Sequence, residues 1–289
     1  MEKNTFGCRI CFQVSNNPSK VCVKGAVRLL ADQMYTVWEC EHCRTLNALE
    51  TVRYDHIYLN YPIQKQKYDF FSKAIFRKRL DILRQAGLTK KEMILDYGCG
   101  SGYFVRFLRE QGFNCEGYDP YNQNFNTKDV LDKRYDLVLS QDVIEHLDDP
   151  RTLLHDLKEL VKDEGLLVIG TPFSEETNMF DIIDQLGVLH QPYHRFIISK
   201  KIVRSFFESN GWCVNNIIES CYMDTWVPFV NSQFLFQLFK SGNGFMDVAF
   251  EPIKFSHWIK HPSLIFWGIF GNFFTKKQDL FIFLRHNNK

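Results

Sequence analysis

The chain has 289 residues with a formal net charge of +1, and 45% of them are hydrophobic. This length is enough to bury one large core and leaves room for a small appendage, and the near-zero charge gives no electrostatic reason to expect a nucleic-acid partner. The nine cysteines are an odd number and occur partly in pairs, which favours a metal site in a reducing compartment over a disulfide framework.

The beginning of the chain carries two Cys-x-x-Cys pairs and no apolar leader, so we expect a cytoplasmic protein. Each pair can bring two thiolates to one tetrahedral ion, and four thiolates leave no open coordination position. The pattern therefore predicts a structural zinc ribbon over residues 1–50, in which either Cys22 or His42 could replace one ligand. The predicted Zn²⁺ ligands are Cys8, Cys11, Cys40 and Cys43.

Residues 51–90 are expected to form a linker with helices ahead of the main domain. The run from Phe70 to Leu83 is basic and amphipathic, so its apolar side should pack on a sheet while its charges face solvent. An alternative is that this basic helix meets an anionic substrate or a membrane. Tyrosines that precede it are candidates for the wall of a substrate pocket.

A glycine-rich turn follows the apolar run 93–95, which is typical of a buried parallel strand. Gly98, Gly100 and Gly102 let the backbone turn tightly and approach a ligand, and the helix that follows offers unpaired N–H groups. A second apolar run ends in Asp119, at about the distance where a nucleotide-binding unit presents a carboxylate to ribose. The alternative is an ordinary tight turn followed by a helix cap.

The next strand, at 135–141, is followed by Asp142, Glu145 and His146. Their i, i+3, i+4 spacing would place all three on one side of a helical turn. His146 can accept a proton near neutral pH, and either acid could orient it. Alternatively, these groups only brace the loop.

The last third of the chain contains a histidine-rich segment, two strands and an aromatic insertion. His190, Tyr193 and His194 are second-rank catalytic candidates. The strands are expected at 212–219 and 279–285, and the insertion lies between them, at about 222–276. Its apolar stretches are too short to span a bilayer, so it is interpreted as a cap over the pocket, a homodimer face or a membrane-surface contact.

Four of these segments together resemble, in the right order, the motifs of class I S-adenosylmethionine-dependent methyltransferases. They are the Gly-x-Gly-x-Gly turn after Asp96, and residues 116–119, 135–150 and 165–172. The resemblance implies an α/β fold over residues 91–289, a Rossmann-like, doubly wound, seven-stranded sheet whose last strand lies antiparallel beside the sixth. The segment 119–136 is shorter than in the longest members, which leaves the third strand and the adenine contact open.

The resemblance also implies which residues serve the cofactor and the reaction. The loop and Asp96 would hold the methionine part, Asp119 the ribose, and Gln141 with Asp142 the region of the adenosine or the methyl group. The predicted S-adenosylmethionine-binding residues are Asp96, Tyr97, Gly98, Cys99, Gly100, Gly102, Asp119, Gln141 and Asp142. The predicted catalytic residues are His146 as the base, Glu145 and His194.

The acceptor is inferred from a further resemblance. A ribbon ahead of such a domain resembles bacterial enzymes of sugar and glycan biosynthesis, so the predicted acceptor is a sugar or glycan precursor. A lipid-like or quinone molecule is the alternative that the aromatic insertion favours, and the acid, acid, histidine arrangement resembles quinone O-methyltransferases, where it is associated with a divalent cation. A third interpretation is a non-catalytic adapter, against which the intact glycine turn and Asp119 argue.

Overall fold

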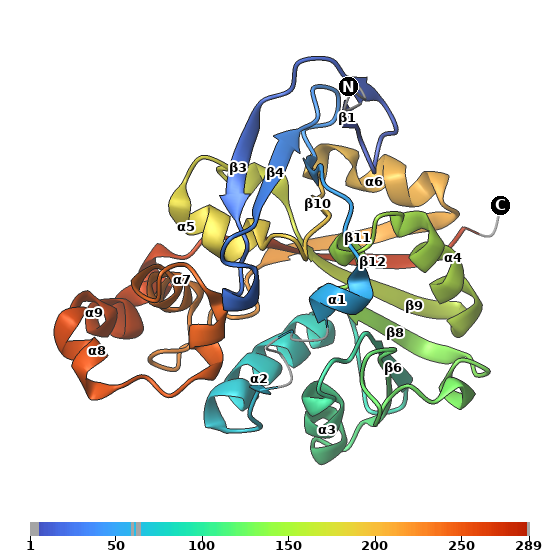
Figure 1. Cartoon of the computed structure of the whole chain (residues 1–289). Coiled ribbons are helices and arrows are strands. Elements are labelled where there is room, and N and C mark those ends of the chain that lie inside the picture. Colours follow the sequence, from blue (N-terminus) through green and yellow to red (C-terminus); the bar gives the residue numbers. More distant parts are fainter. Residues whose placement is uncertain (1–5, 59–60, 62–64, 288–289) are drawn as a thin grey trace.

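Figure 1 shows a computed structural model of the chain, which describes residues 6–58, 61 and 65–287. Over these residues the central sheet has six strands in the order β11-β12-β9-β8-β6-β7. They are β6 (Met93–Tyr97), β7 (Asn114–Tyr118), β8 (Tyr135–Gln141), β9 (Val161–Pro172), β11 (Trp212–Ser220) and β12 (Asp279–His286). Strands β7, β6, β8 and β9 are parallel, and β12 lies antiparallel between β9 and β11, as predicted.

The sheet lacks the predicted seventh strand, which corrects the sequence-based count. Residues 119–134, all of which the structure describes, form the short helical turn η3 (Lys128–Val130) and no strand. The segment is too short for a helix, a strand and two loops. It runs along the edge of the sheet instead, where the hydroxyl of Tyr135 donates to the carbonyl of Val130 at 2.8 Å.

Helices cover both faces of the central sheet, and each face has its own apolar core (Figure 1). The covering helices are α2 (Phe70–Gln85) and α3 (Tyr103–Glu110) on one face, and α4 (Pro150–Leu160) and α6 (Lys200–Ser209) on the other. Strand β12 shows why both cores form: Leu280 and Ile282 join the core of α4 and α6, whereas Phe281 and Phe283 join that of α2 and α3. Alternate side chains of a strand point to opposite faces, so an unbroken apolar run fills both layers.

The N-terminal ribbon shares a sheet and a core with the rest of the chain. Its strands are β1 (Phe6–Gly7), β2 (Val14–Ser15), β3 (Lys20–Lys24), β4 (Met34–Glu39) and β5 (Leu46–Ala48). Strand β5 pairs with β10 (Phe196–Ile197), which gives a second sheet in the order β10-β5-β4-β3. Trp38 on β4 is buried in the same core as Leu95 on β6. Residues 1–50 were predicted as a zinc ribbon ahead of the main domain, and this pairing links them to it.

Short elements lie between these layers at one edge of the central sheet. The helix α1 (Tyr54–Tyr58) follows the ribbon in the chain, and η4 (Ile144–His146) follows β8. The segment between β9 and β10 contains η5 (Ser174–Glu176), α5 (Ile182–Asp184) and η6 (Gln185–Leu189). Parallel strands present their carboxyl ends at one edge, where open α/β sheets bind ligands. The loops after β6, β7 and β8 therefore meet at one place.

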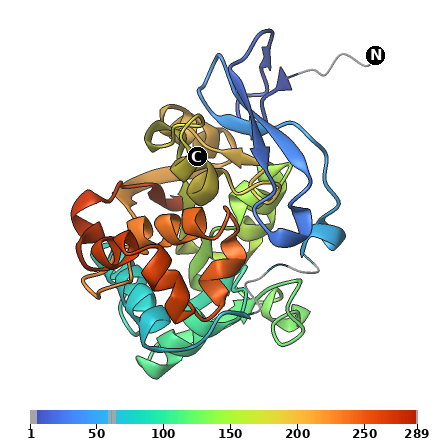
Figure 2. The same cartoon turned by 60° about the vertical axis from the view of Figure 1, so that its left-hand side comes forward.

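The aromatic insertion folds into helices between β11 and β12. These are α7 (Ser232–Ser241), η7 (Met246–Phe250), α8 (Phe255–Lys260), α9 (Ser263–Phe270) and η8 (Gly271–Phe274). Figures 1 and 2 show them together on one flank of the molecule, away from β1. The amide of Phe229 donates to the carbonyl of Gly268 at 2.7 Å, and α7 packs against η6. Among the described helices, none has the length and apolar character needed to cross a membrane.

Replacing Trp38 tests whether the ribbon and the main domain share one core. Trp38 is 1% exposed, so Trp38→Ala should lower the free energy of unfolding by about 3–5 kcal/mol. Met34→Ala is the matched control, because Met34 is exposed on the same strand and should change stability by less than about 0.5 kcal/mol. Urea unfolding followed by circular dichroism measures both. Equal effects of the two changes would contradict a shared core.

Candidate active site and cysteine cluster

The three glycines after β6 adopt backbone conformations that other residues rarely take. Gly98, Gly100 and Gly102 have φ angles of +80°, +55° and +72°. A Cβ atom at Gly98 would lie 2.3 Å from Cγ2 of Val143, and one at Gly102 would lie 2.0 Å from Cε2 of Phe125. Glycine is therefore favoured by conformation at all three positions, and at Gly98 and Gly102 by space as well.

Asp119, at the end of β7, is tied to this glycine turn. Its carboxylate accepts hydrogen bonds from the amides of Gly100 and Tyr121, both at 2.9 Å. The side chain of Asn122 donates to the carbonyl of Gly100 at 2.6 Å. The ends of β6 and β7 are thus held together, and the predicted ribose-binding carboxylate lies beside the turn that was predicted to hold the rest of the nucleotide.

The other predicted cofactor residues of β6 are largely enclosed. Asp96 is 2% exposed, and burial raises the pKa of its carboxyl to about 6, against the attraction of Arg79. The ring of Tyr97 lies 5.2 Å from that of Tyr118 on β7. Burial also raises the pKa of the Cys99 thiol, so the thiol stays protonated at neutral pH.

At the end of β8 the structure departs from the predicted helical arrangement. Asp142 has a φ of +55° and precedes the turn η4 rather than belonging to it. Its carboxylate accepts hydrogen bonds from Gln141 Nε2 at 2.7 Å and from the hydroxyl of Tyr222 at 2.5 Å. The carboxylate of Asp142 is therefore hydrogen-bonded to Gln141 and Tyr222 and makes no hydrogen bond to His146. No sequence pattern indicated Tyr222, which follows β11, because its approach depends on the order of strands in the sheet.

His146 belongs to a cluster of three histidines from distant segments. The ring of His194 lies edge-on to that of His146 at 4.9 Å, and His190 lies 5.3 Å from His194. Nδ1 of His146 is 2.7 Å from the hydroxyl of Tyr58 on α1. The structure thus brings the first-rank and second-rank histidine candidates together, and it adds Tyr58 as the partner of His146.

Glu145 is fully buried beside the histidines but does not hydrogen-bond to His146. Its Oε2 accepts from the hydroxyl of Thr171 at 3.1 Å, while no described residue hydrogen-bonds to its Oε1. A ligand atom of each of Glu145, His146 and His194 lies within 4.8 Å of the other two, so this trio can hold a cation. In this trio His194 takes the place that the sequence assigned to Asp142.

Burial sets the protonation of the cluster. It lowers the pKa of His146 to about 3, with a further contribution from His190, and it lowers the pKa of His190 to about 4. Burial and the nearby Asp142 raise the pKa of Glu145 well above its usual value. At neutral pH the imidazoles are therefore neutral, each with a nitrogen lone pair that is not protonated, and burial favours the protonated form of Glu145.

Tyrosines of the linker close the cluster from outside. The ring of Tyr58 stacks on Tyr121 at 4.8 Å and meets Tyr193 at 5.8 Å, and Tyr61 lies 4.5 Å from Tyr193. These aromatic groups come from α1, the loop after β7 and the segment before β10. The prediction that linker tyrosines line a pocket is consistent with the position of Tyr58 and Tyr61, whereas Tyr68 instead donates to Glu110.

A network around Asp148 ties the ribbon to this site. The buried guanidinium of Arg195 donates to Asp148 at 2.9 Å, and Arg9 of the ribbon donates to the same oxygen at 3.0 Å. The hydroxyl of Tyr54 donates to the other carboxylate oxygen at 2.8 Å. Asp148 stands two residues after His146, so the ribbon, α1 and β10 are all fixed to the loop that carries it. Sequence analysis missed these residues because they lie far apart in the chain.

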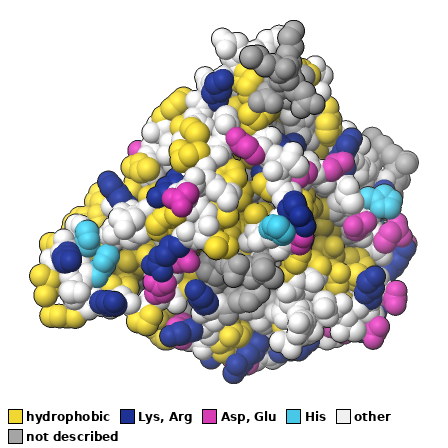
Figure 3. Space-filling model, viewed as in Figure 1, with side chains coloured by type: hydrophobic (Ala, Val, Ile, Leu, Met, Phe, Trp, Pro, Cys, Tyr) yellow, Lys and Arg dark blue, Asp and Glu magenta, His cyan; other side chains and the backbone are white. Residues whose placement is uncertain are grey.

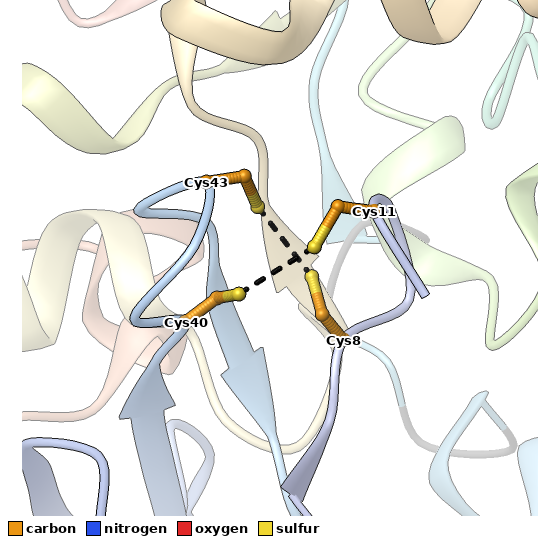
Figure 4. Close-up of side chains that lie close together, drawn as sticks. All are labelled: Cys8, Cys11, Cys40 and Cys43. Atoms are coloured by element: carbon orange, nitrogen blue, oxygen red, sulfur yellow. Dashed lines mark hydrogen bonds between the residues drawn. The ribbon is translucent and has the colours of Figure 1, made fainter. Parts of the chain in front are cut away.

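The four predicted zinc ligands meet at one end of the ribbon (Figure 4). Sγ of Cys8 lies 3.6 Å from that of Cys43, and Sγ of Cys11 lies 3.6 Å from that of Cys40. All four sulfur atoms lie within 4.8 Å of one another. Neither alternative ligand takes part, because Cys22 is exposed on β3 and Nε2 of His42 contacts the carbonyl of Val14.

Comparison with known proteins identifies the family of the main domain. The profile of a family described as "Methyltransferase domain" matches residues 68–245, which is more than half of the chain. The chain belongs to this family. It carries a class I, S-adenosylmethionine-dependent methyltransferase domain, as its motifs predict, and the matched range covers the glycine turn, the β8 loop and the histidine cluster.

Curated relatives of this methyltransferase have names from ubiquinone biosynthesis. A ubiquinone biosynthesis O-methyltransferase of Rickettsia typhi is 28% identical over 139 residues, which are 41% of this chain and 50% of that protein. The mitochondrial ubiquinone biosynthesis O-methyltransferase of Bos taurus is 26% identical over 168 residues, which are 45% of this chain and 43% of that protein. The chain thus spans about half the length of the curated relatives it matches.

Solved structures of low sequence identity also resemble the methyltransferase. The 1,6-didemethyltoxoflavin-N1-methyltransferase of Burkholderia thailandensis, with S-adenosylhomocysteine bound, has a TM-score of 0.44 at 14% identity, over 88% of this chain and 96% of that one. A S-adenosylmethionine-dependent methyltransferase of Mesorhizobium loti has a TM-score of 0.43 at 15% identity, over 72% and 98%.

The buried state of His146 predicts a specific loss of stability in acid. The folded pKa of about 3 lies below the unfolded value near 6.5, so below pH 6.5 only the unfolded chain takes up this proton and the free energy of unfolding falls. At pH 5 the loss should be about 2 kcal/mol. Relative to wild type, His146→Gln should therefore lose less stability between pH 7.5 and pH 5 in urea unfolding experiments.

His155→Gln on α4 is the control for this pH dependence, because the side chain of His155 is 82% exposed. It should follow the wild-type profile. A His146→Gln variant that loses as much stability as the wild type over the same pH range would show that His146 is not buried as a neutral group.

Proposed function

We propose that this methyltransferase transfers the methyl group of S-adenosylmethionine to a hydroxyl oxygen of a quinone-like or lipid-like aromatic molecule. The observation that carries the proposal is the neutral histidine cluster under a wall of tyrosines, which offers a proton acceptor beside apolar and aromatic surfaces. The names of the curated relatives support this acceptor class over a sugar or glycan, which was the main sequence-based interpretation.

The residues at the carboxyl ends of β6, β7 and β8 fit the cofactor. The glycine turn gives the close backbone approach that a nucleotide needs, and Asp119 already holds that turn through Gly100. Gln141 packs so closely on Gly170 that a Cβ atom there would lie 1.7 Å from its Oε1, and this oxygen has no hydrogen-bond partner among the described groups. The proposed binding residues are Asp96, Tyr97, Gly98, Cys99, Gly100, Gly102, Asp119, Gln141 and Asp142.

When bound, S-adenosylmethionine supplies an electrophilic methyl group, so the protein needs mainly to align the acceptor and to remove one proton. We assign the proton to His146. With its proton on Nδ1, His146 donates to the hydroxyl of Tyr58, and Nε2 is then free to take the proton of the acceptor. His194 packs edge-on against the ring and limits its rotation. Glu145 lies buried in the same cluster, where its carboxyl accepts a hydrogen bond from the hydroxyl of Thr171.

The acceptor class can be found by mass spectrometry. The purified protein is incubated with S-adenosylmethionine and with cell extracts separated into lipid, nucleotide-sugar and glycan pools. We expect one added methyl mass in the lipid pool, and a gain confined to a sugar pool would restore the glycan interpretation. If no pool gains a methyl group while calorimetry shows cofactor binding, the adapter interpretation replaces the enzyme. Adding a chelator tests whether the trio Glu145, His146 and His194 needs a cation.

Replacing His146 tests the assignment of the base. His146→Ala should lower turnover at least about 100-fold, which is the usual contribution of a positioned proton acceptor. Cofactor affinity measured by calorimetry should stay within about threefold of wild type, because the predicted cofactor residues are left intact. Tyr58→Phe removes the hydroxyl that fixes the tautomer and should have a smaller effect of the same kind. Unchanged turnover in His146→Ala would refute the assignment.

We further propose that the four ribbon cysteines bind a structural zinc ion. A tetrahedral site with Zn–S bonds of about 2.3 Å places its sulfur atoms roughly 3.8 Å apart, close to the 3.6 Å of the two described pairs. Four thiolates close the coordination shell, so the ion would hold the two loops of the ribbon together and take no part in the reaction. The buried positions of Cys8, Cys40 and Cys43 agree with a structural role.

Metal analysis of the purified protein tests this site. One zinc ion per chain is expected by mass spectrometry of the metal, and Cys40→Ser should remove most of it and lower the melting temperature. Cys22→Ser, at an exposed position of the same ribbon, is the matched control and should keep both values. Equal zinc contents in the two variants would exclude the proposed ligand set.

A further inference from the structure

One flank of the molecule exposes many large apolar side chains. Residues 252–278, which we call the apolar projection, comprise α8, α9 and η8 and the loops that join them. Its exposed side chains include Phe255, Ile259, Phe266, Phe270, Phe273 and Phe274, each at least 46% exposed. Helix α9 is apolar on all sides but buries only Leu264 and Gly268. An apolar surface of this extent marks a contact with another molecule or with a membrane.

The charges on the apolar projection are all of one sign. It contains four lysines, two histidines and no acidic residue over its 27 positions. Lys276 pairs with Asp184, whereas Lys254, Lys260 and Lys277 are exposed and form no salt bridge with a described residue. Figure 3 shows basic and histidine side chains beside apolar ones over the region of α8 and α9. Long lysine side chains can rest on an apolar surface and keep their charge at its rim.

A further exposed aromatic side chain belongs to the same surface. Trp226 is 90% exposed in the loop before α7. That loop is fixed to α9 and η8, because the amide of Phe229 donates to the carbonyl of Gly268 and the side chain of Asn272 donates to the carbonyl of Thr225. Tryptophan is enriched at the boundary between lipid and water, where one ring can contact both.

We propose that the apolar projection docks on the surface of an anionic lipid membrane. Short helices with exposed Phe and Ile and a lysine rim insert into the headgroup region, and their lysines are attracted by anionic lipids. A second copy of the chain fits less well, because a symmetric interface would bring the unpaired lysines of both copies together without acids to neutralise them. Charge therefore favours the membrane over a homodimer as the occupant.

Docking on this face would also place the proposed active site near lipid. Helix α7 of the insertion packs on η6, and Nε2 of His190 lies 2.8 Å from Sδ of Met246 in η7. Helix α7 also packs against α9 of the apolar projection, so docking would bring the proposed active site toward the membrane. This last step rests on the proposed function, whereas membrane docking does not.

Vesicle flotation tests the docking directly. The wild-type protein is mixed at low salt with vesicles of phosphatidylcholine alone or with added phosphatidylglycerol. We expect at least tenfold stronger binding to the anionic vesicles, weakened by salt. Phe266→Ser with Phe270→Ser, and separately Lys254→Glu with Lys260→Glu, should each reduce binding at least tenfold. The controls are Val14→Ser and Lys91→Glu, which change exposed apolar and basic residues outside the projection and should bind as the wild type does.

Independent readouts keep the test decisive if a variant folds poorly. Brominated lipids should quench tryptophan fluorescence of the wild type on anionic vesicles, and Trp226→Phe should reduce that quenching. Absence of vesicle binding by the wild type, or binding that the phenylalanine changes leave intact, overturns the proposal. A dimer that forms without lipid and is lost in Phe266→Ser with Phe270→Ser assigns the face to self-association instead. Vesicle binding is scored without any acceptor, so its failure is separate from failure of methyl transfer.

Discussion

Removal of water from the turn after β8 is the constraint on which the rest of the site depends. The side chains of Glu145 and His146 are buried, and those of Tyr58 on α1 and His194 before β10 pack against His146. Burial then decides their chemistry, since it favours a neutral imidazole and a protonated carboxyl. A loop that could have been an exposed acidic turn becomes a buried, neutral cluster packed against tyrosines.

The ribbon packs directly against the loop that carries His146. Strand β5 pairs with β10, and the carboxylate of Asp148 receives Arg9 from the ribbon and Arg195 from the segment before β10. Two guanidinium groups on one carboxylate, one of them fully buried, fix the position of the β8 loop. A zinc ion held by Cys8 and Cys11, which flank Arg9 in the chain, would thereby stiffen the wall of the proposed site.

The strands of the sheet follow from local sequence, whereas the arrangement of the aromatic insertion follows from contacts between distant segments. Apolar runs at β6, β8, β9 and β12 are buried on both faces, and such runs can be recognised without any structure. The insertion is different, because its helices owe their arrangement to one another: α9 contacts the loop at Phe229, and α7 contacts η6. The sequence shows that these helices are apolar, but only the structure shows which of their side chains stay exposed.

The sequence by itself determined the parts that local chemistry specifies. The glycine turn, Asp119 at the end of β7, the order of the strands along the chain and the two cysteine pairs are short-range patterns, and their physical requirements hold in any context. It could not determine the number of strands in the sheet, since that depends on whether residues 119–134 find space at its edge.

Only the tertiary structure decided the partners of the proposed catalytic residues. The sequence placed Asp142 beside His146 because a helical turn would align them, but the positive φ of Asp142 turns it to Tyr222 instead. Tyr58, His190 and His194 meet at His146 from segments that lie far apart in the chain. Such contacts have no sequence period, and they arise only when the sheet, the ribbon and the insertion pack together and exclude water.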